Sequence, residues 1–347
     1  MNKSTMKITT RRYHSEQGEI VTYRMVNAKG ASVVVSSLGA GILEVNVPNK
    51  MGKVENVALG YAKPTDYLND GPCMGKIPGR YANRIAKGKF AIDGTEYNLA
   101  INNGPNHLHG GPTGFQNRLW DSVIIPDGVR FTYVAKDGEE GYPGEMVVTA
   151  EYRWTDRNRL TLTLKATSTK DTVVNLTNHA YWNLRGADSG CALDHKMRIN
   201  ASRWLPTDEN LVPTGELAPV AGTPMDFRKL RAVGSRIRAN FPALVYGKGY
   251  DNCWVLDSHD AVVLKETTSG RKMTVKTDQP GVQVYTGNWL TGSPVNRSGQ
   301  RYLDYDGIAI EAQGFPDAPN HPDFPSQLLK AGDVYQRYIS FEFSTES

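Results

Sequence analysis

The stretch MVVTAEYRWTDRNRLTLTLKA, residues 146–166, decides the fold class because its apolar residues recur at every second position. The alternating residues are Met146, Val148, Ala150, Tyr152 and Trp154, followed by Leu160, Leu162, Leu164 and Ala166. Successive side chains of a strand point to opposite faces, so each half places one row in a core and the other in solvent. Asp156-Arg157-Asn158 lies between the halves and predicts the turn of an antiparallel pair.

The same alternation continues on both sides of this stretch. It recurs at Val129, Phe131, Tyr133 and Ala135, and near the C-terminus at Ile339, Phe341 and Phe343. Asp93-Gly94 separates two further short apolar runs and predicts a hairpin with a type I′ turn. Repeated strands and turns of this kind are typical of antiparallel sheets.

Helical patterns are scarce, and only Pro64–Leu68 and Asp226–Val233 are predicted as short helices. Without crossover helices between the strands, a parallel α/β fold is disfavoured. The sequence therefore predicts an all-β protein with minimal helix, built as one large antiparallel β-sandwich domain over residues 1–347.

Composition narrows the function classes. Lys and Arg number 40 against 36 Asp and Glu, a net charge of +4 without a basic block, which disfavours nucleic acid as a partner. Cys73, Cys191 and Cys253 form neither a disulfide framework nor a C-x-x-C pair, as in proteins of a reducing compartment. No apolar leader and no window of about 18 uninterrupted apolar residues occurs. We expect a soluble, cytoplasmic monomer without a membrane or nucleic-acid partner.

Six segments interrupt the alternation with clustered polar, aromatic and glycine residues. They are Gly79–Ile85 (GRYANRI), His107–Gly111 (HLHGG), Asn175–Leu184 (NLTNHAYWNL), Gly249–Asn252 (GYDN), Pro280–Asn288 (PGVQVYTGN) and Glu311–Asn320 (EAQGFPDAPN). Carboxylates, amides and guanidinium groups pair with hydroxyls in fixed directions, while aromatic faces cover the C–H faces of a sugar ring. This mixture is what a sugar pocket requires.

These six segments, in this order, resemble the signature segments of the galactose mutarotase (aldose 1-epimerase) family. The strand-rich flanks resemble the rest of the family's fold. The resemblance implies that His179 gives a proton to the sugar ring oxygen and that Glu311 is the base for the anomeric hydroxyl. It further implies substrate-binding roles for a second set of residues, namely Asn83, Arg84, His109, Tyr181, Asp251 and Gln283.

The chemistry of anomer exchange agrees with these roles. The proton of the C1 hydroxyl must leave while the ring oxygen gains one, so that the C1–O5 bond opens and can close on the other face. One carboxylate and one imidazolium suffice, each contributing about 10²–10⁴-fold. Since nothing is oxidised or reduced, we expect no cofactor and no metal. The substrate class implied is free aldohexoses such as galactose and glucose.

Other interpretations remain open from the residues alone. Asp251 and Glu311 would also suit a glycoside hydrolase or lyase, and a non-catalytic sugar-binding module would not require both Glu311 and His179. On a strand, His107 and His109 would share one face, as in some metal sites, although no third ligand at a recognisable spacing accompanies them. Gly110-Gly111 more simply indicates a close approach of two backbones.

Overall fold

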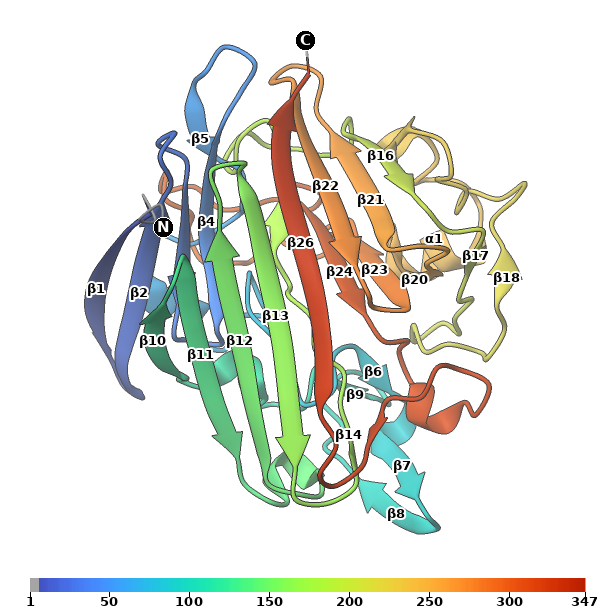
Figure 1. Cartoon of the computed structure of the whole chain (residues 1–347). Helices are drawn as coiled ribbons and strands as arrows, with labels where there is room; N and C mark the ends of the chain where they lie inside the picture. The colour runs from blue at the N-terminus through green and yellow to red at the C-terminus, as the bar shows by residue number, and fades with distance from the viewer. Residues whose placement is uncertain (1–5, 347) are drawn as a thin grey trace.

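The computed structural model describes residues 6–346, which form three large antiparallel sheets (Figure 1). The large sheet contains, in spatial order, β10 (Asp121–Ile125), β11 (Gly128–Ala135), β12 (Met146–Trp154), β13 (Arg159–Ser168), β26 (Tyr335–Thr345), β22 (Arg271–Thr277), β21 (Asp260–Lys265), β16 (Lys196–Ile199) and β19 (Arg231–Ala232). The site sheet contains β15 (Tyr181–Trp182), β24 (Ile308–Gln313), β23 (Gly281–Tyr285), β20 (Asp251–Val255), β17 (Arg203–Trp204) and β18 (Ala218–Pro219). The N-terminal sheet contains β1 (Lys7–Ser15), β2 (Gly18–Val26), β3 (Ser32–Ser36), β4 (Gly41–Pro48) and β5 (Val54–Asn56).

Smaller elements connect these sheets. The short strand pairs are β6 (Arg84–Ile85) with β9 (His107–Leu108), β7 (Lys89–Ile92) with β8 (Thr95–Asn98), and β14 (Thr172–Val173) with β25 (Leu328–Leu329). The 3₁₀ turns are η1 (Pro64–Tyr67), η2 (Ala86–Gly88), η3 (Phe115–Asn117), η4 (Glu139–Gly141), η5 (Val233–Ser235) and η6 (Ala318–Asn320). Within residues 6–346 the one α-helix is α1 (Pro242–Gly247), and no helix there is long and apolar enough to cross a membrane.

The all-β prediction is confirmed, and the stretch that carried it forms the centre of the large sheet. Trp154 pairs with Leu160 across the predicted turn, and the alternating apolar side chains of β12 and β13 are buried. In Figure 1 the large sheet is the front layer, with β23 and β24 of the site sheet behind β22. Side chains from all three sheets, among them Val45, Leu162 and Val284, meet in one hydrophobic core.

The predicted type I′ hairpin is also confirmed. Asp93 and Gly94 connect β7 to β8 with φ values of 48° and 80°, both in the left-handed region that this turn requires. Asp tolerates this region better than most residues, and Gly adopts it without steric cost.

The helix predictions have a mixed outcome. Pro64–Tyr67 forms a single 3₁₀ turn, close to the predicted bounds. The helix predicted for Asp226–Val233 is wrong. Asp226 instead binds the guanidinium of Arg228 with both carboxylate oxygens, and Arg231–Ala232 pairs with β16. The missed helix α1 begins at Pro242, whose fixed φ suits the first helical position, and ends at Lys248 in the left-handed conformation.

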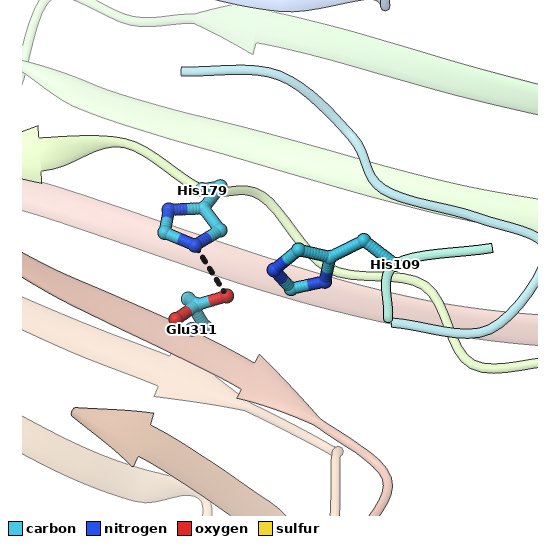
Figure 2. A group of neighbouring side chains, drawn as sticks. All are labelled: His109, His179 and Glu311. Atoms are coloured by element: carbon cyan, nitrogen blue, oxygen red, sulfur yellow. Dashed lines mark ion pairs between the residues drawn. The ribbon is translucent and has the colours of Figure 1, made fainter. Parts of the chain in front are cut away.

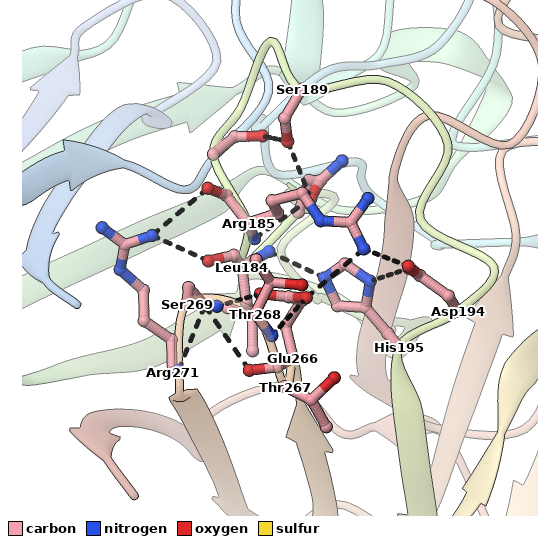
Figure 3. Close-up of polar contacts among 12 residues, drawn as sticks. Leu184, Arg185, Ser189, Asp194, His195, Glu266, Thr267, Thr268, Ser269 and Arg271 are labelled. Carbon is pink, nitrogen blue, oxygen red and sulfur yellow. Dashed lines mark hydrogen bonds and ion pairs between the residues drawn. The ribbon is translucent and has the colours of Figure 1, made fainter. Parts of the chain in front are cut away.

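A buried polar network outside the cleft fixes the segment that follows β15 (Figure 3). Glu266, at the β21–β22 turn, accepts hydrogen bonds from the backbone N–H groups of Thr268 and Ser269 and pairs with Arg185. Arg271 donates to Leu184 O and to Glu55 Oε2. The pKa of Glu266 is lowered to about 2, since these backbone donors outweigh the effect of burial.

We expect Glu266→Gln to destabilise the fold by about 2–3 kcal/mol at pH 7, because about 1.4 kcal/mol accompanies each unit of pKa depression. A depressed carboxyl pKa adds stability above the unfolded value, and that stability is lost as pH falls toward about 2. The difference between wild type and variant should therefore shrink below about pH 4.5. Urea denaturation at pH 7 and pH 4 measures it, and a pH-independent difference would contradict this account.

Candidate active site

The register of the site sheet turns Glu311 away from the hydrophobic core. On β24, Ile308, Ile310 and Ala312 pack into that core, so the alternation places Glu311 on the opposite face. Glu311 lies directly opposite Gln283 on β23, and Gln283 lies opposite Cys253 on β20. This rung of three side chains crosses the middle of the sheet.

The next rung on the same face completes the floor of a cleft. Tyr181 pairs with Ala309, Ala309 with Tyr285, and Tyr285 with Asp251, across four strands. The small side chain of Ala309 leaves room between the two tyrosine rings, whose centroids are 5.9 Å apart. Antiparallel pairing thus gathers residues that are distant in the chain into one surface.

The cleft over this floor has a volume of about 460 Å³. Its lining consists of Gly71, Pro72, Asn83, Arg84, Asn103, Leu108, His109, His179, Tyr181, Asp251, Tyr285, Glu311 and the segment Trp289–Pro294. All the residues singled out from the sequence line it except Gln283. That side chain is 3% exposed and instead donates from Nε2 to Asp251 Oδ1 over 2.8 Å.

Glu311 and His179 meet at the bottom of the cleft (Figure 2). His179 Nε2 lies 3.4 Å from Glu311 Oε1, and both side chains are almost completely buried. Burial raises the pKa of Glu311 well above its usual value, with the charge of Asp251 adding to this and that of Arg84 opposing it. Burial lowers the pKa of His179 to about 4. The carboxylate is thus a stronger base, and the imidazolium a stronger acid, than either free side chain.

His109 faces the pair from a loop that requires unusual backbone conformations. Asn83 and His109 have φ values of 64° and 51°, and their backbones exchange a contact in which His109 N donates to Asn83 O. A Cβ on the adjacent Gly110 would lie 1.9 Å from Gly79 O, so only glycine permits this approach. The close approach predicted for the Gly110-Gly111 step is therefore present.

The tautomer of His109 follows from its partner. Asn83 N donates to His109 Nδ1 over 3.0 Å, so Nδ1 carries the lone pair and Nε2 carries the proton. Burial holds the pKa of His109 well below its usual value, which keeps the ring neutral. His109 therefore presents an N–H donor to the cleft.

The metal hypothesis for His107 and His109 does not fit these contacts. Both ring nitrogens of His107 are engaged, by Ala100 O and the Tyr142 hydroxyl, each at 2.7 Å. His109, His179 and Glu311 do place ligand-type atoms within 4.8 Å of one another. However, a protonated Nε2 on His109 has no lone pair for a metal, and the fixed donor at Nδ1 opposes the other tautomer.

Arg84 and Asp251 supply opposite charges on the walls of the cleft. Arg84 Nε donates to Asn103 Oδ1 over 3.0 Å, which fixes the guanidinium at the cleft edge. Burial raises the pKa of Asp251, whereas the Arg84 charge and the hydrogen bond from Gln283 act against that rise. These groups offer a strong donor and a strong acceptor to a polar ligand.

Several lining residues were not found from the sequence. Trp289 is 64% exposed at the cleft rim, with Lys248 Nζ 4.0 Å from its ring centroid. Tyr285 lay inside the PGVQVYTGN segment and could have been inferred from its period-two relation to Gln283. Gly71 and Pro72 belong to no polar cluster, so no local signal identified them.

The family model described as aldose 1-epimerase matches residues 21–342. The chain belongs to the aldose 1-epimerase family. It is 42% identical over 316 residues to a protein named galactose mutarotase of Sus scrofa, covering 90% of this chain and 91% of that one. It is 37% identical over 335 residues to the aldose 1-epimerase of Escherichia coli, covering 93% and 96%.

A solved structure supports the same assignment. The galactose 1-epimerase from Lactobacillus acidophilus superposes with a TM-score of 0.87 at 28% identity, covering 99% of this chain and 100% of that one. Aldose 1-epimerases are isomerases that act on small sugars, so this protein is an enzyme of the isomerase class.

We expect His109 to remain in the neutral Nε2–H form between about pH 5 and pH 8, because burial and the Asn83 donor both favour it. His107 provides a matched control with the opposite tautomer, since its Nδ1 faces a carbonyl that only an N–H can satisfy. NMR of protein with ¹⁵N-labelled histidine distinguishes the two forms. An Nδ1–H signal for His109 would overturn the argument against metal ligation.

Proposed function

We propose that this aldose 1-epimerase interconverts the α and β anomers of free aldohexoses such as galactose and glucose, with Glu311 as base and His179 as acid. The contact between His179 Nε2 and Glu311 Oε1 at the floor of the cleft carries the proposal. The relatives named galactose mutarotase support galactose as a substrate. A cleft of about 460 Å³ lies in the range of about 300–1,000 Å³ usual for small ligands.

The two groups open the sugar ring by a coupled pair of proton transfers. Glu311 takes the proton of the C1 hydroxyl while His179 gives its proton to the ring oxygen, and the C1–O5 bond opens to an aldehyde. The pair holds one proton before and after this step, and the step converts two buried charges into two neutral groups. Since burial disfavours both charges, the single proton of the free pair rests on Glu311, and ring opening starts from the form in which that proton is on His179. Rotation about C1–C2 and reversal of both transfers give the other anomer.

The surrounding groups suit the orientation of a hexose. The Nε2–H group of His109 lies on the same side as His179, with their ring centroids 5.3 Å apart, where it reaches the ring-oxygen side of the sugar. Arg84 donates to sugar hydroxyls and Asp251 accepts from them. Gln283 helps to hold Asp251 in place through Nε2, and its buried Oε1, which has no hydrogen-bond partner among residues 6–346, is left to contact the sugar. Holding the sugar in this way keeps the reacting oxygens within reach of both proton-transfer groups.

The hydrolase and binding-module alternatives are not favoured. The relatives are named as epimerases or mutarotases, and the cleft joins a carboxylate to a histidine of shifted pKa, as acid–base catalysis requires. The optical rotation of freshly dissolved α-galactose tests the choice directly. Faster equilibration without new reducing ends supports the isomerase, whereas new reducing ends from an oligosaccharide would indicate a hydrolase.

We also propose a cytoplasmic monomer that needs no cofactor. Cys73, Cys191 and Cys253 are all unpaired, which suits a reducing compartment.

Replacement of either proton-transfer group should lower kcat by about 10²-fold or more, with a much smaller change in KM. Glu311→Gln keeps the size of the side chain and removes the base, while His179→Asn removes the acid. The double variant should be little worse than the worse single one, because the two groups act as one unit. Initial polarimetric rates, corrected for the spontaneous reaction, measure these effects.

The controls are the same substitutions elsewhere on the protein. Glu342→Gln breaks an exposed pair with Arg159, and His259 is exposed, so E342Q and H259N should keep wild-type kcat. Arg84→Ala and Asp251→Ala should mainly raise KM, because they remove hydroxyl contacts and leave the proton-transfer pair. Near-normal kcat in E311Q would show that another residue is the base.

The pH dependence of kcat/KM should be bell-shaped, because catalysis requires one proton on the Glu311–His179 pair. As pH falls through about 4, the lowered pKa of His179, the pair gains a second proton and Glu311 can no longer act as base. As pH rises through the raised pKa of Glu311, the last proton leaves and His179 cannot act as acid. Rates across pH measure both limbs. An acid limb near the ordinary histidine value of about 6.5 would contradict the burial argument.

A further inference from the structure

A fully buried ion pair lies behind His179 and has no part in the mechanism above. Lys76 Nζ lies 2.7 Å from Asp70 Oδ1, and both side chains have 0% exposure. The ammonium also donates to Tyr67 O and to Asn117 Oδ1. Asp70 Oδ2 accepts from the Tyr61 hydroxyl and from Met74 N, both at 2.8 Å.

This pair closes the loop from residue 70 to residue 76 on itself. Removing two charges from water costs several kcal/mol per ion, so such a pair persists only where mutual attraction and further hydrogen bonds offset that cost. Two hydrophobic side chains of similar volume in place of such a pair would often make the protein at least as stable. A structural role alone therefore gives no reason for charges at this position, and a role in the adjacent site does.

The loop holds the backbone of His179 directly. His179 N donates to Lys76 O over 2.9 Å, and Gly75 N donates to His179 O over 3.0 Å. Asn178 Nδ2 donates to Gly75 O over 2.8 Å, which fixes the neighbouring residue to the same loop. Lys76 thus carries the buried ammonium and also accepts the backbone hydrogen bond of His179.

The same loop also forms one wall of the cleft. Pro72 lines the cleft, and its carbonyl accepts a hydrogen bond of 2.8 Å from the Tyr181 hydroxyl. The Tyr181 ring lies against His179, with centroids 5.0 Å apart. Backbone and ring contacts from one loop therefore fix His179 on two sides.

We propose that Asp70 and Lys76 are positioning residues for His179: their buried ion pair anchors the loop that holds the histidine over Glu311, and the balance of their charges sets where the Glu311–His179 pair takes up and releases protons. The proposal rests on the function proposed above for that pair. Asp70 and Lys76 act on the pKa of His179 in opposite directions, Asp70 raising it and Lys76 lowering it. The other groups facing His179 are Glu311, His109, Tyr181 and Tyr285.

Breaking the pair from either side should move the pH profile in opposite directions. Asp70→Asn leaves Lys76 without its partner carboxylate, so the acid limb of kcat/KM should move to lower pH. Lys76→Met leaves Asp70 without its partner ammonium, so the alkaline limb should move to higher pH. We expect each shift to be about 0.5–1 pH unit, as for charges interacting through a protein interior.

The double variant D70N/K76M separates charge from anchoring. It removes both charges, so both limbs should return to their wild-type positions, while kcat should remain at least about tenfold below wild type because His179 is held less firmly. The control is Arg271→Met, which removes a buried guanidinium and its pairing with the partly exposed Glu55 outside the cleft lining. It should lower the melting temperature without moving either limb.

Direct titration of His179 makes the test independent of activity. In protein with ¹⁵N-labelled histidine, with the His179 signal assigned by its loss in H179N, the pKa of His179 should fall in D70N. If wild type shows no epimerase activity but this shift occurs, the proposed function fails and the role of the ion pair stands. Unmoved limbs with an unmoved His179 titration in folded D70N would overturn the proposal. So would shifts of the same sign in D70N and K76M.

Discussion

The burial of a carboxylate in the middle of a β-sheet is the constraint on which the rest of this structure depends. Glu311 lies on a strand whose six residues are all buried, and period-two alternation directs its side chain to the face opposite the main core. A charged group at such a position is expensive unless other groups compensate it. The cleft, His179 and Arg84 are all arranged around this one side chain.

Compensation comes from charges that are themselves held by neutral groups. Arg84 opposes the rise in the pKa of Glu311, and it is fixed by Asn103 rather than by a carboxylate. The arginine therefore keeps its charge available to the cleft. On the far side of His179, the opposite charges of Lys76 and Asp70 largely cancel. His179 therefore lies near two buried charges whose sum is close to zero. A small change at either residue would then alter the balance.

The short segments above the floor use backbone strain where the sheet uses regular geometry. Asn83 and His109 both adopt left-handed φ values, and each backbone contacts the other residue. Non-glycine residues in this region cost about 1–3 kcal/mol each, which the surrounding contacts must offset. The result is that a backbone N–H group sets the tautomer of His109, and its Nε2–H donor faces the pair formed by Glu311 and His179.

Sequence alone determined the strands, because alternation is a local property: residues 146–166 fix two strands and their turn without reference to anything else. It also determined the type I′ turn at Asp93-Gly94, since the φ requirement falls on those two residues. The Glu311–His179 pair proposed for catalysis was recognisable from motif order, with Asn83, Arg84, His109, Tyr181 and Asp251 beside it.

Tertiary structure decided what depends on neighbours distant in the chain. Gln283 donates to Asp251, His107 is engaged by Ala100 and Tyr142, and Asp226 binds Arg228 instead of starting a helix. Likewise, no sequence pattern predicts that Lys76 pairs with Asp70 behind His179. Burial and charge compensation are properties of the folded environment and not of local spacing.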